Sequence, residues 1–163
     1  MTLRTLYLAL IFLPVFFVSC QNAELLDETR SFSNHKWMRF EPEEFTAHVN
    51  STDDCFNIYL TATIDTALFR GDALPMTINL YSPSGERRMF RYDLHFKNKK
   101  DGKWLGEWHG DQLSVTRCVR QFFFFNSVGE FKLELAQCTS RYELEGVSQV
   151  GLRIVKAELK YPK

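Results

Sequence analysis

The side chains that could perform catalysis are few and scattered along the chain. The histidines stand apart from one another, at His35, His48, His95 and His109. No GxSxG, HExxH, phosphate-loop or dinucleotide-binding motif is present in the sequence. The one cluster that suggests catalysis is His109-Gly110-Asp111, and its central glycine predicts a turn. We therefore expect no catalytic residue and no enzyme activity.

Cysteine is the other residue type with chemical potential, and it occurs at positions 20, 55, 118 and 138. Neither a CxxC motif nor a pair of closely spaced histidines accompanies these thiols, so no metal site and no cofactor are expected.

Residues 1–19 have the three-part layout of a secretory signal. A short segment with Arg4 leads into an apolar stretch over residues 6–18, and the chain turns polar directly after Cys20. The apolar stretch is shorter than the roughly 20 residues that span a bilayer. The sequence therefore predicts export followed by removal of this segment.

The end of the signal resembles the lipobox of bacterial lipoproteins, in which a small residue precedes a cysteine that receives diacylglycerol. Here Phe17-Val18-Ser19-Cys20 has Phe where that pattern usually has Leu. The resemblance implies cleavage before Cys20 and a membrane anchor on its thiol, with each buried methylene contributing about 0.8 kcal/mol. The alternative is an ordinary secretory signal whose cleavage leaves a free thiol near the N-terminus.

The remaining chain has the length and composition of one folded domain. Its 20 basic and 20 acidic residues cancel and form no block of like charge, which argues against nucleic acid as a partner. Aromatic residues make up 15% of the chain, a composition that favours strands. Residues 20–34 are polar and lack periodicity, so we expect a lipidated cysteine with a flexible tether, followed by the domain at 35–163.

Apolar and polar residues alternate in several segments, which predicts strands. The clearest covers residues 55–65, and another covers roughly 150–159. Segments 76–81 and 89–96 flank Ser82-Pro83-Ser84-Gly85 and predict a hairpin.

A second hairpin is predicted from residues 113–125 and 130–139, around residues 126–129. A three-residue loop with a left-handed Gly129 would pair Asn126 with Glu130. This register would also place Cys118 opposite Cys138, at a distance compatible with a disulfide. Three unbridged thiols are the equally weighted alternative.

Many strands separated by turns, with no sustained helical period, predict an all-β fold. We expect a single-domain antiparallel β-sandwich, with jelly-roll and immunoglobulin-like topologies both open and a closed barrel as the main rival.

Four aromatic residues are candidates for contact with a partner protein or a glycan: Trp104 and Trp108 in a predicted loop, and Phe122 and Phe124 on the predicted outer face of a strand. Exposed aromatic rings can stack on sugars or anchor a protein. The competing interpretation is that neighbouring segments cover them, because large apolar patches are rarely left open.

The chain resembles the gliding-motility lipoprotein GldH family of Bacteroidota. Three segments carry the resemblance: Asn79-Leu80-Tyr81 with Pro83-Ser84-Gly85, then Asp101-Gly102-Lys103-Trp104-Leu105-Gly106, and then Leu144-Glu145-Gly146-Val147-Ser148-Gln149-Val150-Gly151-Leu152-Arg153-Ile154. The chain departs from the family at Ala73-Leu74-Pro75-Met76, where a Tyr-Pro-Tyr-like stretch is usual, and at Cys138-Thr139, where a Met-Arg pair is usual. It resembles a divergent member.

This resemblance implies an all-β lipoprotein of the cell envelope, associated in gliding species with the motility machinery and its linked secretion system. It implies neither enzyme activity nor a cofactor. We therefore expect a non-catalytic lipoprotein that docks other envelope proteins, with a glycan-binding lipoprotein as the alternative. Because the segment after Cys20 has no marked acidic run, the expected location is the periplasmic face of the outer membrane.

Overall fold

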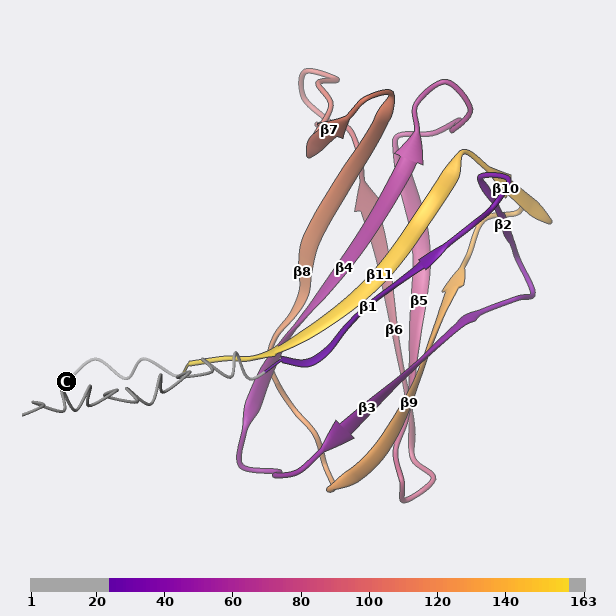
Figure 1. Ribbon diagram of the computed structural model, residues 1–163. Coiled ribbons are helices and arrows are strands. Elements are labelled where there is room, and N and C mark those ends of the chain that lie inside the picture. Colours follow the sequence, from indigo (N-terminus) through magenta and orange to yellow (C-terminus); the bar gives the residue numbers. More distant parts are fainter. Residues whose placement is uncertain (1–23, 159–163) are drawn as a thin grey trace, which may run out of the picture.

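The computed structural model describes residues 24–158, which fold into two antiparallel sheets packed face to face (Figure 1). In spatial order, the first sheet contains β1 (Glu24–Ser31), β11 (Val147–Lys156), β4 (Cys55–Asp65), β8 (Gln112–Phe124) and β7 (Glu107–His109). The second contains β3 (Glu43–Val49), β9 (Gly129–Gln137), β5 (Ala73–Tyr81) and β6 (Arg87–His95). A small ribbon of β10 (Glu143–Glu145) and β2 (Lys36–Met38) flanks them. The expected single-domain β-sandwich is confirmed.

The strand pairing has the order of a jelly roll. Strands from the start of the chain pair with strands from its end, as β1–β11, β3–β9, β4–β8 and β5–β6. These pairs make one long double ribbon, which is rolled so that successive pairs fall in alternate sheets. Of the two topologies that the sequence left open, the structure has the jelly roll.

The core lies between the two sheets, where the alternating apolar residues meet. In β4 the inward side chains are those that periodicity predicts, from Phe56 to Ile64 at every second position. Val150, Leu152 and Ile154 of β11 are buried in the same way. No helix within residues 24–158 has the length and apolar character needed to cross a membrane.

The predicted first hairpin is confirmed as β5–β6. The Ser82 N–H donates to the Glu86 carbonyl at 2.9 Å, and the Gly85 N–H donates to the Ser82 carbonyl at 3.0 Å. Gly85 has φ of 85°, a left-handed conformation that glycine adopts without steric cost.

The predicted second hairpin is wrong, because β8 and β9 lie in opposite sheets. The connection over residues 125–128 crosses the sandwich, and Glu130 pairs with His48 of β3 instead of Asn126. Alternation and a turn-forming glycine are local signals, so they do not distinguish a tight hairpin from a crossover between sheets.

The proposed disulfide loses its geometric basis with that hairpin. Cys118 lies opposite Tyr59 of β4, whereas Cys138 follows β9 in the other sheet and donates its N–H to the Pro75 carbonyl at 2.8 Å. Cys55, Cys118 and Cys138 are all free thiols. The prediction of a Cys118–Cys138 bridge is therefore corrected in favour of three unbridged cysteines.

The tether expected over residues 20–34 is also corrected, because most of it is strand β1. Its residues pair with β11 from Glu24 opposite Val155 to Ser31 opposite Gln149, and Leu26 is buried. A mostly polar strand with one inward apolar side chain is common at a sheet edge, where only one flank is paired. Glu24 therefore already belongs to the folded domain. The predicted signal peptide and Cys20 lie outside the described residues.

Candidate partner-binding site

The four candidate aromatic residues fall at two separate places along β8. Trp108 lies in β7, opposite Leu113 near the start of β8, and Trp104 lies in the preceding loop. Phe122 and Phe124 lie at the far end of the same strand. With a rise of about 3.3 Å per residue, Leu113 and Phe124 are roughly 36 Å apart along the strand. The structure therefore does not unite the four residues into one surface.

The loop that carries Trp104 is held by its own hydrogen bonds. The Asn98 N–H donates to the Lys103 carbonyl at 2.8 Å, and the Gly102 N–H donates to the Asn98 carbonyl at 2.9 Å. The Asn98 side chain also accepts from the Lys100 N–H at 2.9 Å. A β-bridge between Lys97 and Trp104 closes the loop at its base. The position of Trp104 is consequently fixed by backbone contacts.

Gly106 allows β7 to return onto β8. It has φ of 113°, and a Cβ at this position would lie 2.2 Å from the Ser114 carbonyl oxygen. Only glycine fits such a close approach of two backbones. The glycine therefore sets where Trp108 stands.

The two tryptophans form a supported aromatic pair. Their ring centroids are 6.0 Å apart at an interplanar angle of 80°, an edge-to-face arrangement. Trp104 is half-buried against the core, and the Lys97 ammonium lies 4.6 Å from its ring centroid. Trp108 is 50% exposed. We call Trp104, Trp108 and Lys97 the tryptophan surface.

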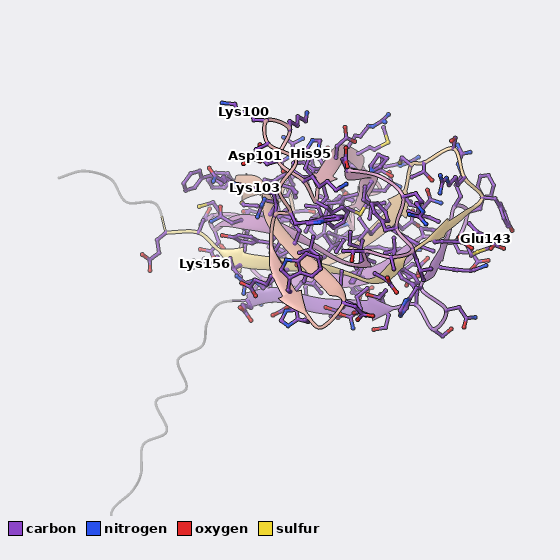
Figure 2. The ribbon with its side chains drawn as sticks, turned by 90° about the horizontal axis from the view of Figure 1, so that it is seen from above. His95, Lys100, Asp101, Lys103, Glu143 and Lys156 are labelled. Atoms are coloured by element: carbon purple, nitrogen blue, oxygen red, sulfur yellow. The ribbon has the colours of Figure 1, made fainter. Side chains whose placement is uncertain are left out.

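Positive charge adjoins the tryptophan surface. A cavity of about 280 Å³ borders the loop and is lined by Asp72, Ala73, His95, Lys97, Asn98, Lys99 and Gly102. Lys97 pairs with Asp72 at 2.9 Å and Lys103 with Asp101 at 3.5 Å. Among the described residues, Lys99 and Lys100 have no carboxylate within 4.0 Å. Figure 2 shows Lys100, Asp101, Lys103 and His95 close together in this region.

Phe122 and Phe124, which we call the phenylalanine pair, stand on an irregular part of β8. The pairing with β4 shifts register on both sides of Ile58, and Phe122 has a left-handed φ of 51°. The Phe122 N–H donates to the Asn57 Oδ1 atom at 3.1 Å. The two rings are 49% and 47% exposed. Between them Phe123 points inward and packs edge-to-face on Phe90 and Phe125.

Phe122 and Phe124 thus occupy the outward face that alternation predicted, although the partner strand is β4 instead of β9. Lys97, Lys99 and Lys100 lie within seven residues of Trp104, so the sequence contains this signal, but alternation alone does not show that the loop closes between Lys97 and Trp104. A third exposed aromatic pair was also missed: Phe40 and Tyr142, whose rings lie 6.0 Å apart. Its only signal is the polar sequence around Tyr142.

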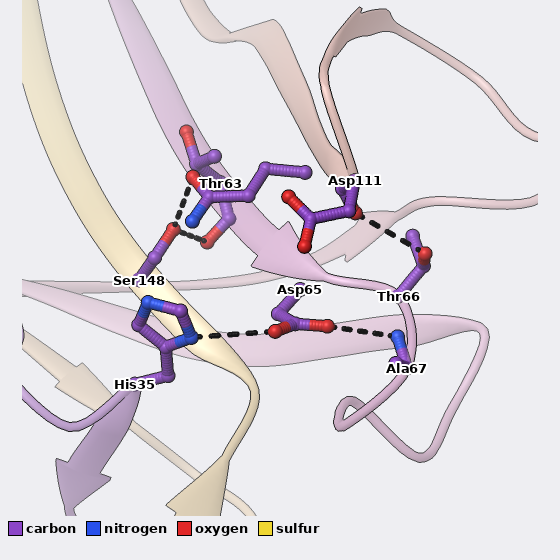
Figure 3. Close-up of polar contacts among 8 residues, drawn as sticks. His35, Thr63, Asp65, Thr66, Ala67, Asp111 and Ser148 are labelled. Carbon is purple, nitrogen blue, oxygen red and sulfur yellow. Dashed lines mark hydrogen bonds and ion pairs between the residues drawn. The ribbon is translucent and has the colours of Figure 1, made fainter.

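The polar residues at the end of β4 form hydrogen bonds that connect strands and loops (Figure 3). His35 Nδ1 lies 3.4 Å from Asp65 Oδ2, and the other oxygen of Asp65 accepts from the Ala67 N–H at 2.9 Å. The buried Ser148 hydroxyl donates to the Thr63 carbonyl at 3.1 Å. Since that hydroxyl is engaged by a carbonyl, its geometry is that of a structural contact between β11 and β4.

His109-Gly110-Asp111 connects β7 to β8, with Gly110 at φ of 66°, as expected of a turn. Within residues 24–158, no group of three or more His, Cys, Asp and Glu side chains is placed to hold a metal ion.

The segments that carry the family resemblance have structural roles. Residues 101–106 form the loop that supports Trp104 and Trp108. In the third segment, Gly146 has φ of 84°, and a Cβ there would lie 2.2 Å from the Phe69 nitrogen. In the first, buried Asn79 accepts a hydrogen bond from Arg87 at 3.1 Å. These residues maintain the fold, and the 101–106 segment leads directly into the strand that carries the exposed Trp108.

Comparison with known proteins agrees with the resemblance to the GldH lipoprotein family. The family model described as GldH lipoprotein matches residues 24–154. The chain is also 24% identical over 157 residues to a protein described as gliding motility lipoprotein GldH homolog from Christiangramia forsetii, covering 91% of this chain and 93% of that protein. On the match over residues 24–154, this chain belongs to the GldH lipoprotein family.

Proposed function

We propose that this protein is a non-catalytic lipoprotein that docks other envelope proteins through the tryptophan surface, while lipid on Cys20 holds it on the periplasmic face of the outer membrane. The observation that carries the proposal is the half-exposed Trp108, which packs edge-to-face on a fixed Trp104. The loop before Trp104 also carries Lys99 and Lys100, which have no carboxylate within 4.0 Å among the described residues. In gliding species the docked partners would belong to the motility machinery or its linked secretion system.

The anchor part of the proposal rests on family and sequence together. Members of this family are named lipoproteins, and Cys20 follows a signal-like segment ending in Phe17-Val18-Ser19. The absence of an acidic run after Cys20 supports the periplasmic face over the cell surface. Replacement of Cys20 by alanine should abolish incorporation of a labelled lipid precursor, and label retained by that variant would contradict the anchor.

The choice of a protein partner rests on the geometry of the tryptophans. A large aromatic side chain on a rigid support, surrounded by polar residues, is typical of the residues that dominate protein interfaces. Because the two indoles meet at 80°, they offer no shared flat platform for a sugar ring. Lys99 and Lys100 would favour an acidic patch on the partner, chiefly by accelerating association.

The test compares two exposed aromatic residues in cells. Crosslinking followed by mass spectrometry should identify a partner with the wild-type chain and with Tyr142→Ala, a matched control at a different exposed site. Trp108→Ala should lose that partner. Equal capture by both variants would contradict the role of the tryptophan surface. Trp108-dependent binding of a purified envelope glycan, without any protein partner, would favour the glycan alternative instead.

A further inference from the structure

The phenylalanine pair lies in one row with the residue at which the described domain begins. Glu24 of β1 pairs with Val155 of β11, and Val155 pairs with Asn57 of β4. The Asn57 side chain accepts the Phe122 N–H of β8. The row therefore crosses three strand spacings of about 4.8 Å, which places Phe122 about 14 Å from Glu24. In Figure 1, the start of β1 and the end of β11 lie beside the lower end of β8.

The distance from Glu24 to the lipid site is equally short. Only three residues separate Cys20 from Glu24, so the backbone between them spans at most about 14 Å even when fully extended. A bilayer that holds acyl chains on Cys20 therefore lies within reach of Glu24, and the phenylalanine pair stands at a comparable distance along the sheet.

We infer that Phe122 and Phe124 face the bilayer that holds the Cys20 lipid and enter its headgroup region. This inference rests on lipid attachment at Cys20, which is part of the proposed function. On amphipathic helices, apolar faces that contain phenylalanine insert about 5–10 Å into the boundary between headgroups and acyl chains, and we expect the same of exposed phenylalanine rings on a strand. Phe122 and Phe124 are each about half exposed and lie on the same face of β8, so together they offer an apolar surface to a bilayer.

The local backbone presents these rings outward. Phe122 holds a left-handed φ, which is uncommon for a residue other than glycine, and the adjoining register shifts are β-bulges, which re-aim side chains. Val155 is half-buried and pairs with Asn57, so it lies on the same outer face in the row that leads to Phe122. Tyr59 lies farther along the sheet, opposite Cys118, with the Arg153 guanidinium 5.1 Å from its ring centroid.

Two ion pairs and one cation without a carboxylate lie near the phenylalanine pair. Lys156 pairs with Asp54 at 2.6 Å, and Arg153 lies 3.8 Å from Glu24. Arg120, two residues before Phe122, has no carboxylate within 4.0 Å among the described residues, and its guanidinium lies 4.5 Å from the Phe90 ring centroid. Contact with the bilayer would consequently depend on burial of the rings, with Arg120 adding an attraction to anionic lipid that salt weakens.

The experiment uses the full-length lipidated protein in vesicles whose lipids are brominated along the acyl chains. Bromine quenches a nearby indole, so Phe122→Trp and Phe124→Trp should each add emission that falls when brominated lipid replaces plain lipid. Phe40→Trp is the matched control, because Phe40 is 72% exposed but lies beside β2 and β10. Its added emission, and that of the native Trp37, Trp104 and Trp108, should not change. Thermal melting would verify that each variant keeps the fold.

Several results would overturn the inference. If the protein floats with the vesicles but neither Phe122→Trp nor Phe124→Trp is quenched, the pair does not face the lipid. If a chain ending at Glu158 is quenched where the complete chain is not, residues 159–163 cover the pair instead. A protein that does not float has no lipid anchor, which overturns the anchor and this inference together. Quenching of Phe40→Trp and of the native tryptophans as strong as that of Phe122→Trp and Phe124→Trp would mean that no particular face is turned towards the bilayer, which also overturns the inference.

Discussion

The two ends of β8 carry the same class of side chain in different settings. At its start, Trp108 lies in β7, which a close glycine contact holds against β8, and it packs on Trp104 in a lysine-containing loop that backbone hydrogen bonds fix. At its end, Phe122 and Phe124 lie on a bulged part of the strand, close to the first described residue. We therefore propose different roles for the two sets of aromatic residues, which differ in their support and in their distance from Cys20.

The largest predicted effect is a difference in the free energy of unfolding between variants of two neighbouring residues at the end of β8. Phe125 is buried and packs edge-to-face on Phe56, Phe123 and Phe131. Phe125→Ala should lower the free energy of unfolding by about 3–5 kcal/mol through the cavity it leaves. Phe124→Ala should change it by no more than about 0.5 kcal/mol, because the ring is exposed. Urea denaturation would measure both, and a large loss for Phe124→Ala would mean that the pair serves the fold.

The next effect concerns the glycines that support the tryptophan surface. Gly106→Ala should cost at least about 2 kcal/mol, since a left-handed backbone costs a residue with a Cβ about 1–2 kcal/mol and this Cβ would also meet the Ser114 carbonyl. Gly102→Ala is the control. It has φ of 68° but no atom within 4 Å of a Cβ, so only the conformational cost remains. Equal stabilities of the two variants would contradict the close approach of β7 and β8.

Substitution of Trp104 should mainly lower the stability of the fold, whereas substitution of Trp108 should mainly weaken binding of the partner. Trp104→Ala should lower the free energy of unfolding by about 1–2 kcal/mol, because the indole is half-buried against the core. Trp108→Ala should leave the melting temperature almost unchanged but weaken binding of the partner identified by crosslinking by at least about tenfold. If Trp108→Ala unfolds the protein and leaves binding intact, the two residues have the opposite roles.

The smallest effect lies midway along β8, at Cys118. Burial raises the pKa of the Cys118 thiol, so less reactive thiolate is present near neutral pH than for an exposed cysteine. Alkylation followed by mass spectrometry should show slow labelling that accelerates as the pH rises. Without reduction, peptides containing Cys118 and Cys138 should appear separately, and a linked peptide would contradict the placement of the two residues in different sheets.

Local patterns in the sequence predicted the parts of the fold that depend on local physics. Alternation identified β4 and β11, the Pro-Gly turn identified the β5–β6 hairpin, and alternation gave the outward direction of Phe122. Pairing between β8 and β4 joins segments far apart in the chain, so no neighbouring residues encode it. Strand β1 escaped prediction because an edge strand needs few apolar side chains.

The residues of the candidate site were predictable from the sequence, but their arrangement in space was not. The sequence supplied the four aromatic residues, but their division into two surfaces depends on the length of β8 and on the row that connects Phe122 to Glu24. Neither feature can be deduced without knowing which strands are neighbours.

The central claim is that the two ends of β8 meet different partners. The most direct test places a photoreactive amino acid at position 108 or at position 124 of the full-length chain and irradiates intact cells. Position 108 should give crosslinks to protein, and position 124 should give adducts with lipid and none with the protein captured at position 108. The same protein crosslinked from both positions, or protein crosslinks from position 124 alone, would contradict the account.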